Sequence, residues 1–253
     1  GSVAFGLADE LWGAGFDAGC RDGIAVPEPI GYAASLHMWF QRKVAGAPAT
    51  DLLAKPGGEA LARRVAEAAH KVHRAGVRPR RRHTMLDELE VLCGRLHLVA
   101  EARPCWARRI DRVRRAAIRI GAATRDPAPR GIHRDFYGDQ ILVDGPRMWL
   151  TDFDLYCEGD PALDVGNFIG HIREHSLRVL GDPWALAHVE RAIEDRFVEL
   201  SGEHTRGAVR SYVKLTLARH IYLSMLFVER RIFTEPLLEL CEACLDDGAD
   251  GAR

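Results

Sequence analysis

The chain has 253 residues, of which 47% are hydrophobic and 28% are charged. This composition is typical of a globular protein and excludes a disordered chain, a coiled coil and a collagen-like fibre. The 35 Lys and Arg residues balance 36 Asp and Glu residues, so the overall charge gives no reason to expect a nucleic acid or an anionic membrane as partner. The longest apolar stretch, residues 213–228, contains Lys214, Arg219 and His220, which predicts a buried helix and no membrane span.

Cysteine usage and the first residues indicate the compartment. Six cysteines are sparse for this length and favour free thiols in a reducing, cytoplasmic environment. No basic start followed by an apolar run is present, so no secretion signal is visible. Cys241 and Cys244 form a C-x-x-C pair within a helical pattern; without a second pair or a nearby His, a metal or redox role is the minor alternative.

The first 45 residues predict one helix and two strands. Helical spacing of apolar residues predicts a helix over 3–14, which ends at glycines. Residues 26–32 and 37–44 predict two strands, and Ala-Gly-Ala-Pro at 45–48 ends the second. Because two antiparallel strands are too few to be stable alone, we expect this opening to be part of a sheet whose other strands lie elsewhere or are missing.

Helices dominate the rest of the chain. Residues 59–76, 84–100 and 104–121 predict three helices, and the pattern is helical from residue 165 almost to the end, where the tail is expected to fray. The third helix places four arginines on one face, at positions 108, 112, 115 and 119. An anion-binding stripe is one interpretation, and a solvated helix face is the favoured one.

Polar side chains flank a short predicted hairpin. Residues 141–143 and 148–150 predict two strands joined by the turn sequence Asp-Gly-Pro-Arg. This register places Gln140 opposite Thr151, so Asp152 is one step from the partner of Gln140. Diagonal neighbours across an antiparallel pair lie about 5–8 Å apart. We therefore expect Gln140 and Asp152 to emerge together, with Asp135 brought to the same place by the preceding loop.

These residue types suit phosphoryl transfer. A carboxylate and an amide oxygen at that separation can both bind a hard cation such as Mg²⁺, which prefers oxygen ligands. A further carboxylate can accept the proton of a hydroxyl nucleophile, and phosphoryl transfer needs both elements. Aspartates beside turns also cap backbone groups, so a purely structural role is the alternative.

The motifs resemble a known family. His-Arg-Asp-Phe-Tyr-Gly-Asp-Gln at 133–140, hereafter the catalytic loop, is similar to the H-x-D-x-x-x-x-N loop of kinases. Thr-Asp-Phe-Asp at 151–154, followed by Gly-Asp-Pro-Ala-Leu-Asp at 159–164, resembles the aminoglycoside phosphotransferase and choline kinase branch. The resemblance implies an α+β, protein-kinase-like fold, with a partial β N-lobe at residues 1–45 and a mostly helical C-lobe at residues 46–253 that carries the catalytic hairpin.

The resemblance also implies roles for individual residues. Asp135 resembles the catalytic base, and His133 a residue that braces the loop. Asp152 resembles the principal Mg²⁺ ligand, Gln140 stands where the family usually has Asn, and Asp154 is a further metal ligand or supports one.

Three further roles concern the frame of the site. Asp164 resembles the residue that anchors the catalytic loop, and the backbone at Arg42 and Val44 would meet the adenine of ATP. Glu10, on the first helix, would pair with the phosphate-binding Lys of the family. No Lys precedes that helix, so we expect a longer natural chain to supply one, and residues 1–253 alone to transfer phosphate poorly.

The resulting hypothesis is an ATP-dependent, Mg²⁺-requiring kinase that phosphorylates a hydroxyl of a small polar molecule, such as an aminoglycoside, a sugar or an amino alcohol. Glu229 and Glu235 could meet a cationic acceptor, although solvated positions are favoured. The alternatives are a non-catalytic kinase-like binding module and a metal-dependent phosphohydrolase. The sequence leaves the acceptor, the choice of ATP or GTP and the oligomeric state open.

Overall fold

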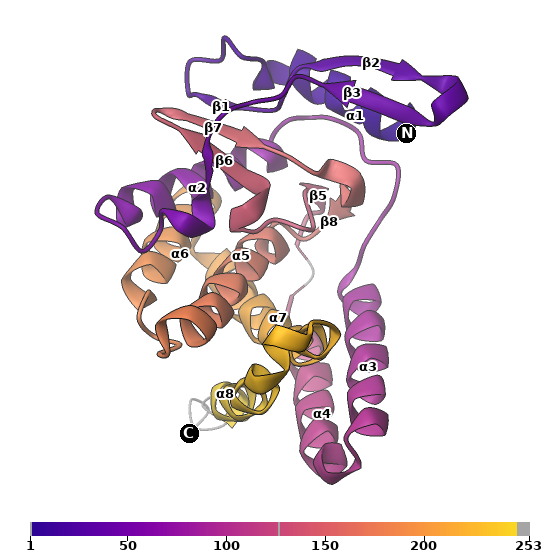
Figure 1. Cartoon of the computed structure of the whole chain (residues 1–253), viewed down its shortest axis with the longest axis vertical. Coiled ribbons are helices and arrows are strands. Elements are labelled where there is room, and N and C mark those ends of the chain that lie inside the picture. The colour runs from indigo at the N-terminus through magenta and orange to yellow at the C-terminus, as the bar shows by residue number, and fades with distance from the viewer. Residues whose placement is uncertain (1, 126, 247–253) are drawn as a thin grey trace.

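A small amino-terminal lobe lies at one end of the molecule, against a larger helical lobe (Figure 1). The structure is a computed structural model that describes residues 2–125 and 127–246. In the small lobe, α1 (Ser2–Leu11) continues into a π-helical turn (Trp12–Phe16) and packs on the antiparallel hairpin of β2 (Pro29–Ala33) and β3 (Met38–Gln41). The tail from residue 247, which we expected to fray, lies outside the described residues.

The predicted catalytic hairpin is the centre of a four-stranded sheet. β6 (Ile141–Asp144) and β7 (Arg147–Leu150) pair antiparallel, β4 (Ala47–Pro48) lies beside β6, and β1 (Ile24–Ala25) runs parallel to β7. The predicted register is confirmed, because Asp144 pairs with Arg147 and the Thr151 N–H donates to the Gln140 carbonyl at 2.9 Å. The sequence pattern missed β1 and β4, because each has only two residues and is too short to show the alternation of a strand.

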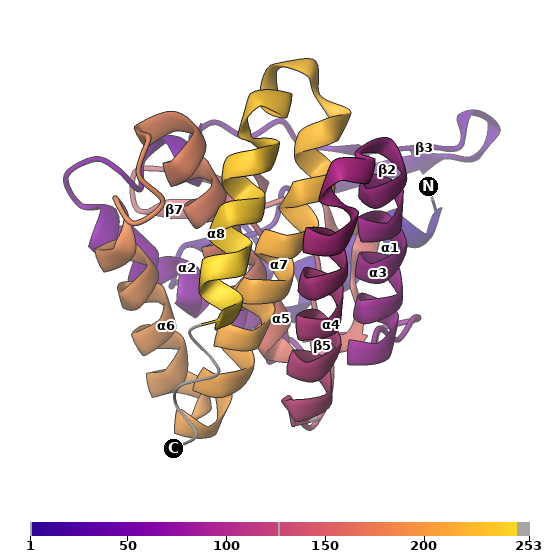
Figure 2. The same cartoon turned by 90° about the horizontal axis from the view of Figure 1, so that it is seen from below.

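The remaining elements form the helical lobe and one small strand pair, β5 (Arg130–Ile132) with β8 (Cys157–Gly159). The helices are α2 (Gly58–His73), α3 (Met85–Ala102), α4 (Ala107–Ala123), α5 (Pro161–His175), α6 (Ala187–Ser201), α7 (Arg206–Leu226) and α8 (Thr234–Asp246). A capping box begins α3, in which Asp87 N–H donates to Thr84 Oγ1 and Thr84 N–H donates to Asp87 Oδ2. Figure 2 shows α3 and α4 side by side along α7.

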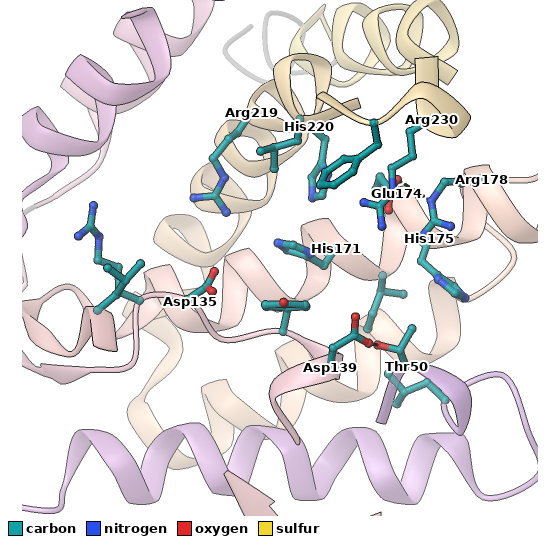
Figure 3. Close-up of a pocket in the computed structure, with 18 of the residues that line it drawn as sticks. Thr50, Asp135, Asp139, His171, Glu174, His175, Arg178, Arg219, His220 and Arg230 are labelled. Atoms are coloured by element: carbon teal, nitrogen blue, oxygen red, sulfur yellow. Dashed lines mark hydrogen bonds and ion pairs between the residues drawn. The ribbon is translucent and has the colours of Figure 1, made fainter. Parts of the chain in front are cut away.

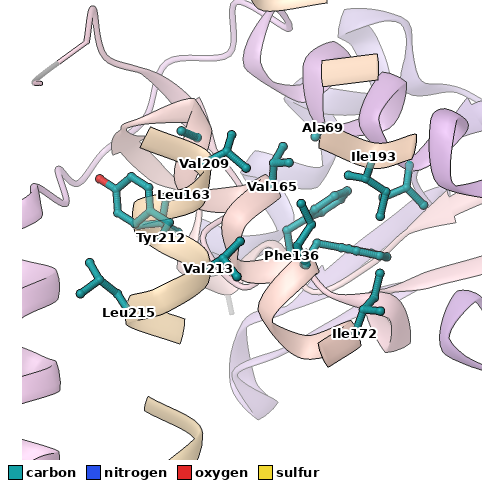
Figure 4. Packing of buried hydrophobic residues seen from close by; sticks show 14 of the residues in the cluster. Ala69, Phe136, Leu163, Val165, Ile172, Ile193, Val209, Tyr212, Val213 and Leu215 are labelled. Atoms are coloured by element: carbon teal, nitrogen blue, oxygen red, sulfur yellow. The ribbon is translucent and has the colours of Figure 1, made fainter. Parts of the chain in front are cut away.

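The core is built around α5, which packs on α7, α2 and α6 (Figure 4). Two glycines on α5 allow α7 to approach closely. A Cβ at Gly166 would lie 2.4 Å from the Cβ of Tyr212, and one at Gly170 would lie 2.6 Å from Cγ2 of Thr216. Because α5 also carries Asp164, the packing of this core fixes one anchor of the candidate site. No helix among the described residues is long and apolar enough to cross a membrane.

Two sequence features have structural explanations. On α4, the four arginines of the stripe are exposed, as the favoured interpretation of a solvated helix face expects, and Arg112 pairs with Glu242 at 2.8 Å while Arg115 pairs with Asp111. The C-x-x-C cysteines are both buried in α8. No group of three or more His, Cys, Asp and Glu side chains in the described part of the chain could hold a metal ion by itself.

Candidate active site

The catalytic loop is fixed by a buried carboxylate from α5. Asp164 is fully buried and accepts the backbone N–H groups of His133, at 2.9 Å, and Arg134, at 2.6 Å. Its Oδ2 also lies 2.9 Å from His73 Nε2. These bonds hold Arg134 at a φ of +70°, in the left-handed region that side chains disfavour. Asp164 thereby sets the direction in which Asp135 leaves the loop.

His133 supports the loop from inside the protein. Its ring is fully buried, lies 4.5 Å from the ring of Phe153 between centroids, and has its Nε2 2.8 Å from the carbonyl oxygen of Thr151. Because that carbonyl can only accept, Nε2 carries the proton and donates. The buried ring is closed to a ligand, so its place in the structure is that of a brace between the loop and the end of β7.

Gln140 and Asp152 come together as the register predicts. Gln140 Nε2 lies 3.3 Å from Asp152 Oδ2, and Gln140 Oε1 accepts from the Thr151 hydroxyl at 3.0 Å. Asp152 is exposed and has a φ of +60°. A half-turn of the amide would exchange its two ends and present the oxygen to the same space as the carboxylate. One carboxylate and one amide oxygen fit Mg²⁺, which retains several waters.

A cavity of about 290 Å³ lies between the small lobe and the end of the catalytic hairpin. Asp152 and Asp154 line it together with Trp39 and Gln41 of β3 and Val26 after β1. We call it the strand-side cavity. Its lining combines the aromatic ring of Trp39 with the two carboxylates. Sequence reasoning missed Trp39 and Gln41, because it placed the contacts at Arg42 and Val44, at the end of the strand predicted over 37–44.

A second cavity, the large pocket, lies in the helical lobe and has a volume of about 400 Å³ (Figure 3). Asp135 lines it, half-buried, and burial raises the pKa of this carboxyl. The positive charges of Arg219 and Arg134 oppose that rise, whereas the charge of Asp152 adds to it. Asp135 thus lines the large pocket, and its carboxyl is influenced by the charge of Asp152, which lines the strand-side cavity.

The residues predicted to frame the nucleotide are placed differently. The N–H of Arg42 donates to the Glu28 carbonyl at 2.8 Å, so it is not free for adenine, contrary to our expectation. Val44 lies after β3 and lines neither cavity. Glu10, on α1, lies 3.9 Å from Arg80, and none of the chain's lysines lines either cavity.

Several residues of the large pocket escaped sequence analysis. Arg219 is the clearest case, because it interrupts an apolar stretch and was assigned to a buried helix. The helix is indeed buried, but Arg219 faces the pocket, donates to the Asn167 side chain and lies 3.4 Å from Glu88. Asn167 in turn donates to the Phe136 carbonyl at 2.9 Å. The sequence signal that could have identified Arg219 as a pocket residue was its position as a charged residue inside an apolar helical stretch.

Comparison with known proteins shows the family to which the chain belongs. Residues 10–198 match the phosphotransferase enzyme family. This matched range includes the motifs at 133–140 and 151–164. The chain belongs to this phosphotransferase family. The family assignment and the kinase-like α+β fold predicted from the two motifs are confirmed. A comparison with curated protein sequences finds no match.

Solved structures of similar fold cover almost the whole phosphotransferase chain. A choline/ethanolamine kinase family protein from Mesorhizobium loti is 18% identical, with a TM-score of 0.67, over 96% of this chain and 78% of that one. A glucosamine kinase is 16% identical, with a TM-score of 0.64, over 96% and 69%. A thermostable aminoglycoside phosphotransferase APH(4)-Ia, in complex with AMP-PNP and hygromycin B, is 18% identical, with a TM-score of 0.66, over 97% and 83%.

Proposed function

We propose that this phosphotransferase moves the γ-phosphate of ATP to a hydroxyl group of a small polar molecule, in the cytoplasm and with Mg²⁺. The observation that carries the proposal is the position of Asp135, which lines the large pocket while Asp152 lines the strand-side cavity. An acceptor in the first cavity and a nucleotide in the second would meet at the catalytic loop. The similarity to kinases solved with AMP-PNP or with glucosamine and ADP supports this arrangement.

Asp135 would act as the proton acceptor. As the hydroxyl oxygen of the acceptor bonds to the γ-phosphorus, its proton passes to the Asp135 carboxylate, and the bond from phosphorus to the ADP oxygen breaks. Asp164 and His133 hold the loop so that the carboxylate keeps its place, and Asn167 fixes the carbonyl of the next residue, Phe136. The rate enhancement from this carboxylate would come from positioning, because the acceptor hydroxyl is held with its proton directed at an Asp135 oxygen.

Asp152 and Gln140 would hold the Mg²⁺ ion, which when bound neutralises charge on the phosphate chain. Asp152→Asn is expected to weaken nucleotide binding about tenfold or more when Mg²⁺ is present. Without Mg²⁺, wild type and variant should bind nucleotide alike. Calorimetric titration with AMP-PNP, with and without Mg²⁺, measures both. Equal Mg²⁺-dependent gains in the two proteins would contradict this assignment.

A screen of hydroxyl acceptors with full-length protein, ATP and Mg²⁺ tests the function. ADP formation that requires an acceptor, and that Asp135→Asn abolishes, is the expected result. Asp144→Asn, an exposed aspartate at the tip of the hairpin, is the matched control and should behave as wild type. Release of free phosphate without transfer would indicate a phosphohydrolase. Nucleotide binding without any turnover would indicate a non-catalytic module.

A further inference from the structure

Arginines dominate the wall of the large pocket. Five arginine side chains line it, against four carboxylates. The arginines are Arg95, Arg134, Arg178, Arg219 and Arg230, and the carboxylates are Glu88, Asp135, Asp139 and Glu174. They come from α3, the catalytic loop, α5 and the π-helical turn after it (Ser176–Leu180), α7 and the turn before α8, so the charge surrounds the cavity instead of lying on one helix.

Two of these arginines are already neutralised. Arg178 lies 2.9 Å from Glu174, and Arg219 lies 3.4 Å from Glu88. Both carboxylates are buried, so these ion pairs are part of the wall. The carboxylate of Asp139 accepts from the Thr50 hydroxyl at 2.6 Å.

Three guanidinium groups of the pocket have no carboxylate within ion-pair distance among the described residues: those of Arg95, Arg134 and Arg230. Arg95 lies 5.8 Å from the ring of Tyr222, and Arg230 lies 5.0 Å from that of Phe227. An aromatic face supports a guanidinium without neutralising it. Figure 3 shows Arg230 directed into the pocket, toward the helix that carries His171.

Three histidines line the pocket, His171, His175 and His220, and burial lowers the pKa of each of them. His171 and His220 lie with ring centroids 4.4 Å apart, and burial together with nearby arginines lowers the pKa of His220 to about 3 and that of His171 well below its usual value. Both rings are therefore neutral at physiological pH. An ammonium group entering here would meet unpaired guanidinium groups and would find only Asp135 and Asp139 as carboxylates outside the ion pairs.

We propose that the acceptor is an alcohol that carries an anionic group, a carboxylate or a phosphate, held by Arg95 and Arg230 while its hydroxyl faces Asp135. The inference rests on the proposed function and names its substrate class. A planar guanidinium binds carboxylate or phosphate oxygens through two parallel N–H groups, and such charged hydrogen bonds are strong where water is excluded. Glu229 and Glu235, which we had considered as contacts of a cationic acceptor, do not line this pocket.

Acceptors that share a skeleton and differ only in charge test the proposal. One series is glucosamine, glucose, glucuronate and glucose 6-phosphate; the other is serinol, glycerol, glycerate and glycerol 3-phosphate. Calorimetric binding to the protein saturated with Mg²⁺ and AMP-PNP is measured for each compound. We expect an anion to bind at least about tenfold more tightly than the amine of its series. The carboxylate and phosphate members tell which anion is preferred.

Variants connect the preference to the arginines. Arg95→Gln and Arg230→Gln should each weaken anion binding about tenfold or more and change glucose or glycerol binding little. Arg191→Gln, an exposed arginine on α6, is the control and should leave every affinity unchanged. A changed affinity for AMP-PNP with unchanged anion binding would overturn the proposal, since the arginines would then serve the nucleotide.

The outcome separates this inference from the proposed function. An amine that binds best in its series, or affinities that do not depend on charge, would overturn the substrate class even if transfer to a neutral or cationic alcohol is found. Anion binding that requires Arg95 and Arg230, without ADP formation that requires Asp135, would support the binding site and overturn the proposed function.

Discussion

At the residue scale, Asp135 must be deprotonated to act as a proton acceptor, although its burial disfavours the charged form. Burial raises the pKa of this carboxyl, so it binds its proton more tightly in the folded protein than in the unfolded chain. Only the deprotonated form can accept the acceptor's proton. Activity should therefore fall as the pH drops through this raised pKa, at a higher pH than an exposed aspartate would give.

A profile of kcat/KM against pH measures this acid limb. Asp135→Asn should lower kcat about 10²–10⁴-fold. Because it removes the ionisation that burial opposes, it should also remove the stabilisation that protonation of Asp135 contributes as the pH falls through the raised pKa, which a comparison of Tm against pH in the two proteins measures. An acid limb at the pH of an exposed carboxyl would contradict the role of burial.

Single residues also show how far sequence reasoning reaches. Gln140 and Asp152 were placed together correctly, because a two-residue turn fixes the register of a hairpin. Arg95 and Arg230 could not be placed, since they line one pocket only after α3 and the turn before α8 have packed on α7. Local periodicity carries no information on such distant encounters.

At the element scale, the attachment of the catalytic loop to α5 depends on Asp164. Asp164→Ala would leave two buried backbone N–H groups and His73 without their acceptor. We expect the free energy of unfolding to fall by about 3–5 kcal/mol, as measured with urea. Asp9→Ala, at an exposed position on α1, should change it by less than about 0.5 kcal/mol. Equal losses in the two variants would show that Asp164 does not anchor the loop.

The contact between α5 and α7 gives a second test at this scale. Gly166→Ala places a methyl group 2.4 Å from Tyr212 Cβ and should destabilise the protein by about 1–3 kcal/mol. Gly94→Ala, in α3, meets nothing within 4 Å and should stabilise it by about 0.5–1 kcal/mol, because alanine favours the helix. Opposite signs in thermal unfolding are the expected outcome, and two losses of similar size would argue against a close helix contact.

Element boundaries were predicted unequally. The helix expected over residues 59–76 is α2, and that over 84–100 is α3, each within a few residues, because their amphipathic patterns are long. The strands of two and three residues were missed or only partly seen. β1 forms because β7 offers a free edge, which is a property of the folded sheet and of no local sequence.

At the scale of the whole molecule, one lysine connects the small lobe to α2. Lys71 Nζ donates to the Gly15 carbonyl at 2.9 Å and the Ile24 carbonyl at 2.7 Å, pairs with Asp22 and lies over the ring of Phe16. It thus holds the segment between α1 and β1. This role explains why it lines neither cavity.

Lys71→Met should therefore release that segment. We expect faster amide hydrogen exchange over residues 15–25 and a loss of about 1–3 kcal/mol in the free energy of unfolding. Lys55→Met, an exposed lysine before α2, is the control and should change neither quantity. Unchanged exchange in the Lys71 variant would show that packing alone holds the lobe.

The left-handed backbone at Arg134 and Asp152 has a consequence for engineering. Each such position costs about 1–3 kcal/mol, and both flank the reacting groups. A glycine at 134 would remove that cost and make the folded protein more stable. It would also let the carboxylate of Asp135 adopt a wider range of orientations. Selection for heat resistance alone would thus favour replacements that leave the Asp135 carboxylate less precisely oriented. Thermostable variants of this protein should therefore be screened for turnover from the start.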